Sequence, residues 1–138
     1  MLDQITPVIL TYNEAPNIGR NLERLAWAGE VVVVDSGSDD ETAGIVGRFP
    51  NARLVVRPFD SHARQWTFAV QETGIATPWV LRLDADYIVP EATIREIAAL
   101  APGPEIGGYR AAFDYCIDGH RLRGSLYPQA PLLFRRGP

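Results

Sequence analysis

Three short apolar segments, each followed directly by polar side chains, constrain the fold of this chain most strongly. The segments are residues 7–10, 31–34 and 79–83. Short apolar runs containing β-branched residues are typical of strands buried on both faces of a parallel sheet. The carboxyl ends of parallel strands lie at one edge of a sheet, so the polar groups that follow these segments are expected to meet there.

Helical spacing fills the stretches between the apolar segments. Ile18 and Leu22 follow Pro16, which suits a first helical turn, and residues 61–73 and the segment after Pro90 repeat the pattern. A shorter strand is expected at residues 53–56, and residues 38–41 fit a capping box that opens a helix. The sequence therefore predicts an α/β fold, a Rossmann-like three-layer α/β/α sandwich around a mostly parallel sheet.

The last third of the chain follows another pattern. Asp118 and Gly119 form a turn signal, which predicts a C-terminal β-hairpin in which residues 122–126 pair back on the preceding strand. Residues 131–134 are expected to form one more short strand, and Cys116 is expected in the core of its strand.

Composition limits the classes of protein that this chain can belong to. It has 138 residues, a single domain's worth, and its net charge of -4 argues against nucleic-acid binding. One cysteine excludes an internal disulfide and suits a reducing cytosol. No signal peptide and no apolar run of ~20 residues is visible, so we expect a cytoplasmic protein, soluble or peripheral to a membrane.

The two aspartates after the third apolar segment are the strongest site candidates. Mg²⁺ and Mn²⁺ prefer hard oxygen ligands and are held by one or two carboxylates together with substrate phosphates. We therefore expect Asp86 to bind a divalent cation, with Asp84 at the ribose or beside the metal. The plain alternative for such a pair is a solvated turn after a strand.

Two further polar clusters complete the predicted edge. Residues 11–14 are candidates for shaping a nucleobase pocket or for capping the following helix; they are Thr11, Tyr12, Asn13 and Glu14. Asp35 and Ser36 end an apolar strand, where an unpaired charge is costly. The Asp35 carboxylate is expected to accept bonds from a base or ribose, or else from a backbone N–H or an arginine.

Basic side chains supply the remaining candidates. Arg64 and His62 lie near a predicted helix start, from which they can reach a diphosphate with help from the helix dipole. The late arginines are predicted to form either a solvated face or a contact surface for an anionic acceptor or lipid headgroups. They are Arg110, Arg121, Arg123, Arg135 and Arg136.

Taken together, residues 8–14, 32–42 and 83–86 resemble the donor-binding part of an inverting family 2 glycosyltransferase with the GT-A fold. More narrowly, residues 57–63 and 122–128 resemble the branch that adds glucose to the lipopolysaccharide inner core. The resemblance implies a UDP-sugar donor, a Mg²⁺ or Mn²⁺ cofactor and transfer of a hexose, with glucose as a candidate. It also implies a saccharide or glycolipid acceptor and a place at the cytosolic face of the inner membrane.

The resemblance also shows what this chain lacks. Many family members carry a glycine near Ser61 and an asparagine near Thr67, and these positions differ here. Inverting displacement needs a carboxylate base on the acceptor side, and neither Asp114 nor Asp118 lies in a matching motif. The sequence therefore predicts a truncated chain whose catalytic base is unassigned.

Two other functions stay open at this point. One is a module that binds a nucleotide-sugar without transferring it, which the missing base favours. The other is a sugar-nucleotide pyrophosphorylase, which would need a glycine-rich, basic N-terminal loop that residues 11–14 do not supply.

Overall fold

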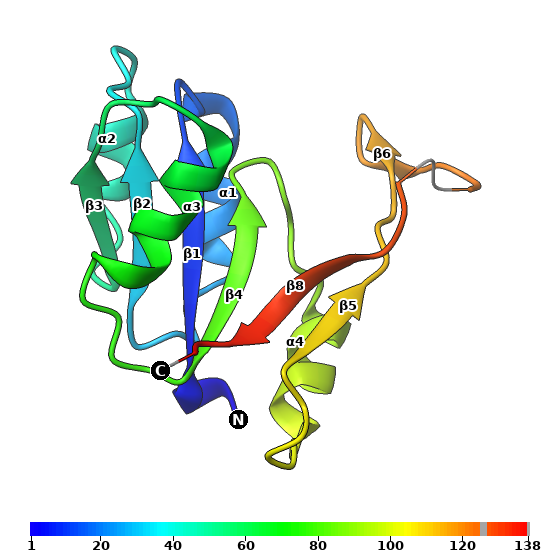
Figure 1. Ribbon diagram of the computed structural model, residues 1–138. Coiled ribbons are helices and arrows are strands. Elements are labelled where there is room, and N and C mark those ends of the chain that lie inside the picture. Colours follow the sequence, from blue (N-terminus) through cyan, green and yellow to red (C-terminus); the bar gives the residue numbers. More distant parts are fainter. Residues whose placement is uncertain (125–126, 138) are drawn as a thin grey trace.

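The computed structural model describes residues 1–124 and 127–137, and its central feature is a six-stranded sheet (Figure 1). The strand order is β3-β2-β1-β4-β8-β5. The strands are β1 (Ile5–Thr11), β2 (Val31–Asp35), β3 (Ala52–Val56), β4 (Trp79–Asp84), β5 (Gly108–Ala111) and β8 (Ala130–Arg135). The helices are α1 (Ala15–Glu23), α2 (Thr42–Val46), α3 (His62–Gln71) and α4 (Glu91–Ala99), with a short 3-10 turn at Leu2–Gln4.

The first four strands of the chain pair in parallel. Strand β2 is buried throughout, as its unbroken apolar run predicts, and β1 lies between β2 and β4. The chain moves from β1 to β2 and β3 on one side, then returns to place β4 on the other side of β1. Such a reversal of strand order opens a crevice at the carboxyl ends of the two strands beside it.

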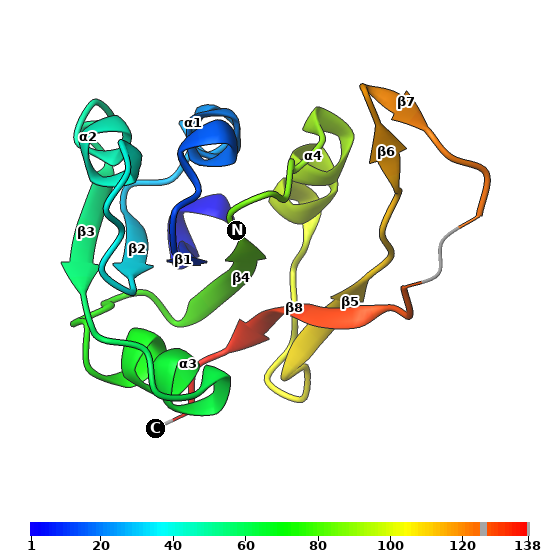
Figure 2. The ribbon, with the colours of Figure 1, turned by 90° about the horizontal axis from the view of Figure 1, so that it is seen from above.

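Helices cover both faces of the sheet, which confirms the three-layer sandwich. Figure 2 shows α1, α2 and α4 on one face and α3 on the other. Alternate residues of each strand face the two layers: Ile9 and Val33 pack in the core beneath α1, α2 and α4, whereas Val8 and Val32 pack in the core that includes Ala69 of α3. The period of two along a strand produces this division.

The antiparallel part of the sheet is built by the last strands. Strand β8 pairs antiparallel with both β4 and β5, so the strand predicted at residues 131–134 is confirmed. Within the described residues, no helix has the length and apolar character that crossing a membrane requires.

The predicted C-terminal hairpin is present as β6 (Cys116–Ile117) and β7 (His120–Arg121) and extends away from the sheet (Figure 1). Asp118 and Gly119 both have positive φ, at 48° and 78°, which is the geometry of a tight hairpin turn. The residues that pair back are His120–Arg121 and not residues 122–126: residues 122–124 form no strand, and residues 125 and 126 lie outside the described part. The expectation that Cys116 is a core residue is wrong: it is exposed, because the hairpin extends into solvent.

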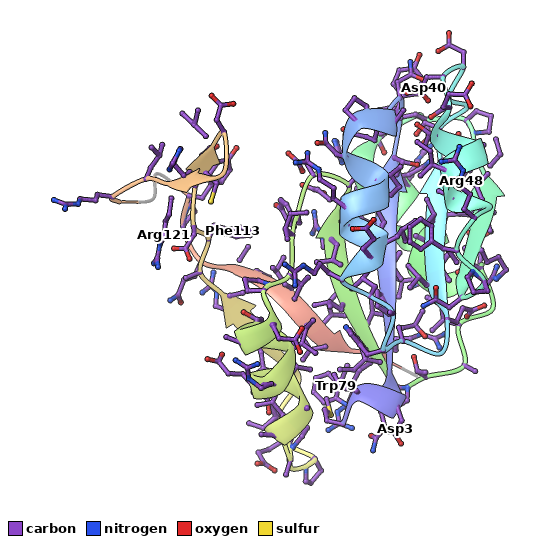
Figure 3. The ribbon with its side chains drawn as sticks, turned by 180° about the vertical axis from the view of Figure 1, so that it is seen from behind. Asp3, Asp40, Arg48, Trp79, Phe113 and Arg121 are labelled. Carbon is purple, nitrogen blue, oxygen red and sulfur yellow. The ribbon has the colours of Figure 1, made fainter. Side chains whose placement is uncertain are left out.

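Two further details differ from the sequence prediction. Helix α2 begins at Thr42 without a side-chain cap, because the Ser38 hydroxyl donates to Asp35 instead of capping the helix. The late arginines do not form one surface: Arg135 lies over the Trp79 ring, and Arg136 donates to the carbonyl oxygen of Ile75. Figure 3 shows Arg121 on the extended hairpin, far from Trp79.

Candidate functional site

The polar ends of β1, β2 and β4 lie at one edge of the sheet, where they were expected to converge. Thr11 pairs with Asp35 across β1 and β2, and Leu10 pairs with Asp84 across β1 and β4. The three strands are parallel and adjacent, so their last residues lie side by side where the strand order reverses, which is the place where α/β sheets bind ligands.

Asp35 organises the middle of this edge. Its buried carboxylate accepts hydrogen bonds from the Thr11 and Ser38 hydroxyls at 2.9 and 2.6 Å. It also accepts the backbone N–H groups of Gly37 and Ser38 at 3.0 and 2.7 Å. Four bonds match the acceptor capacity of a carboxylate, and they hold the turn in which Gly37 takes a φ of 95°. Pairing with backbone N–H groups, one of the alternatives open in the sequence, is therefore present; contact with a donor stays a prediction.

Hydrogen bonds connect the loop after β1 to the loop after β2. Asn13, with a left-handed φ of 51°, donates its backbone N–H to the Ser38 hydroxyl at 2.8 Å, and its side chain accepts the Asp39 N–H at 3.0 Å. The Glu14 N–H donates to the Thr42 hydroxyl at 3.0 Å. The two polar clusters thus form one connected rim.

Asp40 fixes the outer end of this rim (Figure 3). It accepts the Thr42 hydroxyl at 2.5 Å and the Ala15 N–H at 3.2 Å. The hydrogen bond from Thr42 holds the pKa of Asp40 below its usual range. Tyr12 is 58% exposed at the same rim, so its ring is available to a ligand.

Asp84 and Asp86 are both exposed, whereas Ala85 between them is buried. Asp84 is the last residue of β4 and Asp86 lies in the turn that follows, and both carboxylates face solvent. The Asp84 carbonyl accepts the Tyr87 N–H and the side-chain amide of Asn21, each at 3.0 Å. Asn21 is buried in α1, so this helix holds the aspartate-bearing turn in place.

The residues present fit a Mg²⁺ or Mn²⁺ site that is completed by a ligand. Among the described residues, no group of three or more His, Cys, Asp or Glu side chains is placed to hold a metal. A pair of carboxylates is nevertheless what Mg²⁺ requires when substrate phosphates supply further oxygens. Asp84 and Asp86 form no ion pair with any of the residues that the structure describes, so no basic side chain there competes with a cation for their carboxylates.

Tyr87 lies beside the aspartate pair. Burial raises the pKa of Tyr87 to about 12, and the charge of Asp84 and a hydrogen bond to it act in the same direction. The phenol therefore stays protonated at neutral pH and acts as a hydrogen-bond donor at this edge.

Arg64 and His62 begin α3, which is capped by the Ser61 hydroxyl. Arg64 lies 3.4 Å from Asp60 with most of its side chain exposed, and His62 packs edge-on against Phe59. The pair therefore flanks a helix N-terminus, where a diphosphate would be favoured. Their role in ligand binding stays a prediction.

The sequence reasoning missed Asn21 and a group of aromatic residues. We call Tyr87, Phe113, Tyr115 and Tyr127 the aromatic cluster. Asn21 was detectable, because a polar residue next to Leu22 interrupts the apolar side of its helix. The aromatic cluster was not, because its members come together only in the folded chain.

The two late acidic candidates for a base differ in their surroundings. Asp114 is engaged with Arg121 at 2.7 Å, and Asp118 lies in the hairpin turn. Neither observation assigns a catalytic base.

The sheet, its helical layers and the antiparallel strand β8 make up a GT-A fold, as comparison with solved structures shows. Residues 6–135 match the family model described as Glycosyl transferase family 2. The chain belongs to this family.

Among curated proteins, the chain is similar to the lipopolysaccharide core biosynthesis glycosyltransferase LpsC of Rhizobium meliloti (strain 1021). The two are 34% identical over 114 residues, which cover 78% of this chain and 41% of LpsC. The chain spans less than half the length of the curated relatives that it matches.

Solved structures agree with this assignment. S. aureus TarS 1-349 in complex with UDP superposes with a TM-score of 0.56 at 27% identity, over 70% of this chain and 31% of TarS 1-349. Glucosyl-3-phosphoglycerate synthase from Mycobacterium tuberculosis, in complex with Mn²⁺, UDP and phosphoglyceric acid, gives a TM-score of 0.57 over 76% of this chain and 41% of that chain. At 23% identity, the similarity to glucosyl-3-phosphoglycerate synthase shows only that the two chains share a fold.

Proposed function

We propose that this chain is the donor-binding part of a glycosyltransferase that moves a hexose from a UDP-sugar to a lipopolysaccharide core saccharide by inverting displacement. The observation that carries the proposal is the exposed Asp84–Asp86 pair at the sheet edge where β1 and β2 also end. The UDP complex of TarS supports the donor class, and the name of LpsC supports the acceptor. Glucose is the hexose that we propose first.

Different side chains bind different parts of the donor. The rim built from the loops after β1 and β2 receives the uridine, and Asp35 keeps that rim in shape through its bonds to Thr11 and Ser38. Arg64 and the start of α3 attract the diphosphate. Other donor contacts are proposed for Tyr12, Asn13, Glu14, Ser36 and Asp84.

Asp86, with Asp84 beside it, would hold Mg²⁺ or Mn²⁺ against the diphosphate. When bound, this cation supplies Lewis-acid stabilisation of the charge that develops on the leaving UDP. The acceptor hydroxyl needs a base that is not assigned in this chain. The single cysteine suits a reducing compartment, and we place the reaction in the cytoplasm, at the cytosolic face of the inner membrane.

A second candidate function is binding of a nucleotide-sugar without transfer. It is favoured by the ion pair of Asp114 with Arg121, which occupies a late carboxylate that a base role would need free. A turnover assay with UDP-hexoses separates the two: measurable transfer or donor hydrolysis excludes the binding module.

Calorimetric titration of UDP tests the donor site. With Mn²⁺ present, we expect binding that weakens about tenfold or more in a chelator, because the diphosphate loses its bridging cation. Asp86→Ala is expected to abolish the metal-dependent part of the affinity, since one of the two carboxylates is removed.

Arg48→Ala is the control for this titration. Arg48 is exposed beyond the end of α2 (Figure 3), and its removal is expected to leave UDP affinity unchanged. Equal affinity for UDP with Mn²⁺ and with chelator would contradict the metal role. No binding of UDP under either condition would contradict the donor class itself.

A further inference from the structure

The aromatic cluster lies directly beside the aspartate pair. Tyr87 follows Asp86 in the chain, and its ring centroid is 5.2 Å from that of Phe113. Phe113 lies 6.1 Å from Tyr127, which stacks on Tyr115 at 5.3 Å with an interplanar angle of 23°. A continuous row of rings therefore runs from the proposed metal carboxylates onto the extended part of the chain.

These rings are not simply the small core of the hairpin region. Tyr115 is 39% exposed and Tyr127 is 56% exposed, although each lies against another ring. Rings that served only to anchor this region would be covered by it. Instead, the row presents aromatic faces to solvent next to the place where the donor diphosphate is proposed to bind.

The chemistry of the rings is amphipathic. Tyr87 and Tyr115 add hydroxyl groups to apolar faces, which suits a ligand with both apolar and hydroxyl surfaces. A hydrogen bond with Tyr127 and partial desolvation raise the pKa of Tyr115, and the negative charge of Asp86 adds to this.

Polar groups border the same region. Asp114 and Arg121 form an ion pair at 2.7 Å and line a hollow of about 480 Å³ together with Leu122, Arg123 and Gly124. The Leu122 N–H donates to the Tyr115 carbonyl oxygen at 2.7 Å, so this hollow is joined to the backbone of the aromatic cluster, and its carboxylate and guanidinium groups can bind sugar hydroxyls.

We propose that the aromatic cluster is an acceptor subsite, on which a pyranose ring of the acceptor saccharide stacks its apolar C–H face while the hydroxyls of Tyr87 and Tyr115 bind its rim. The inference rests on the proposed function, because the cluster borders the site assigned to the donor. It gives the acceptor a defined place one residue away from the carboxylate that holds the donor's cation.

Binding of core oligosaccharide released from lipopolysaccharide by mild acid tests this subsite. The chain is titrated with the oligosaccharide by calorimetry, with and without UDP and Mg²⁺. Tyr115→Leu keeps apolar volume but removes the aromatic face, so the affinity is expected to fall about tenfold. Tyr115→Phe keeps the face and loses one hydroxyl, so a smaller loss of about threefold is expected.

Ile117→Ala is the matched control, because Ile117 is 58% exposed on the same hairpin and lies outside the aromatic cluster. It is expected to leave the affinity for the oligosaccharide unchanged. Should Tyr115→Leu fail to fold, the wild-type chain with ¹³C-labelled tyrosine rings provides the second measurement: Tyr115 resonances are expected to shift on titration with the oligosaccharide.

Affinity for UDP, measured on the same samples, separates this inference from the proposed function. We expect Tyr115→Leu to bind UDP as the wild type does. Unchanged oligosaccharide affinity in Tyr115→Leu, or no oligosaccharide binding by the wild type, would overturn the subsite. A loss of UDP affinity in Tyr115→Leu would assign the rings to the donor and would equally overturn it.

Discussion

At the scale of single residues, Asp35 shows how a buried charge shapes a loop. Its two oxygens are occupied by two hydroxyl and two backbone donors, so the carboxylate is compensated without a cation. Such an arrangement has little tolerance for a change in hydrogen-bonding character, because its donors are two backbone N–H groups, the buried Thr11 hydroxyl and the half-buried Ser38 hydroxyl.

Asp35→Asn is therefore expected to destabilise the fold although the two side chains have nearly the same shape. The amide would keep its oxygen toward the N–H groups of Gly37 and Ser38, so its NH₂ would face the Thr11 and Ser38 hydroxyls, which now donate and would have to turn into acceptors. We expect a loss of about 3 kcal/mol in the free energy of unfolding, measured by urea denaturation. Asp39→Asn, at an exposed neighbouring position, is the control. Equal stability of the two variants would show that the Asp35 bonds contribute nothing.

At the scale of elements, the connection from β3 to α3 is held by one acidic residue between two arginines. Asp60 lies 3.0 Å from Arg57 and 3.4 Å from Arg64, and it also accepts the Ser61 N–H at 2.7 Å. Arg57 in turn donates to the buried Gln65 at 2.7 Å. These contacts set the position of the helix start at which we place the diphosphate.

This connection predicts a specific pH dependence of stability. The hydrogen bond from Arg57, followed by that from the Ser61 N–H, holds the pKa of Asp60 well below its usual range. A carboxyl group whose pKa is lower in the folded than in the unfolded chain stabilises the fold at pH values above its unfolded pKa of about 3.9. This contribution is lost as the pH falls toward the pKa of the folded state.

Asp60→Asn should therefore lower the free energy of unfolding at pH 6 and converge with the wild type in strong acid. The measurement is urea denaturation at a series of pH values between about 6 and 2. Because these groups are exposed, the difference is expected to be small and to shrink in high salt. A constant difference at every pH would refute the assignment to the Asp60 charge.

The elements themselves were largely predictable, and the reasons are local. A strand such as β2 can be predicted from an apolar run that ends at a charged residue. The turn at Asp118 and Gly119 can be predicted because both residue types accept positive φ. The start of α2 could not be predicted from the sequence, because the Ser38 hydroxyl donates to Asp35 and does not cap the helix. The aromatic cluster depends on contacts between Tyr87 and residues far along the chain, which no local pattern encodes.

At the scale of the whole molecule, stability is distributed unevenly. The parallel body has two cores, whereas β6 and β7 pair only with each other and all four of their residues are exposed. Local opening requires little energy where few apolar contacts and few paired amides are lost.

Amide hydrogen exchange is expected to reveal this division. Amides of β1 and β2, such as those of Ile9 and Val33, should exchange only on global unfolding. Those of Ile117 and His120 should exchange near the rate of an unstructured chain. Comparable protection in both groups would mean that the hairpin is anchored by contacts beyond its own pairing. Addition of the core oligosaccharide should slow exchange near Tyr115 if the subsite is occupied.

The place of β8 in the sheet has a consequence for synthesis. Strand β4, which ends in Asp84, pairs with β1 on one side and with β8 on the other. While the polypeptide emerges from the ribosome, β4 therefore stays an open sheet edge until residues 130–135 have been translated. An exposed, apolar edge recruits other strands, so the nascent protein is most vulnerable to misassembly in that interval, and a chaperone that shields β4 would act there.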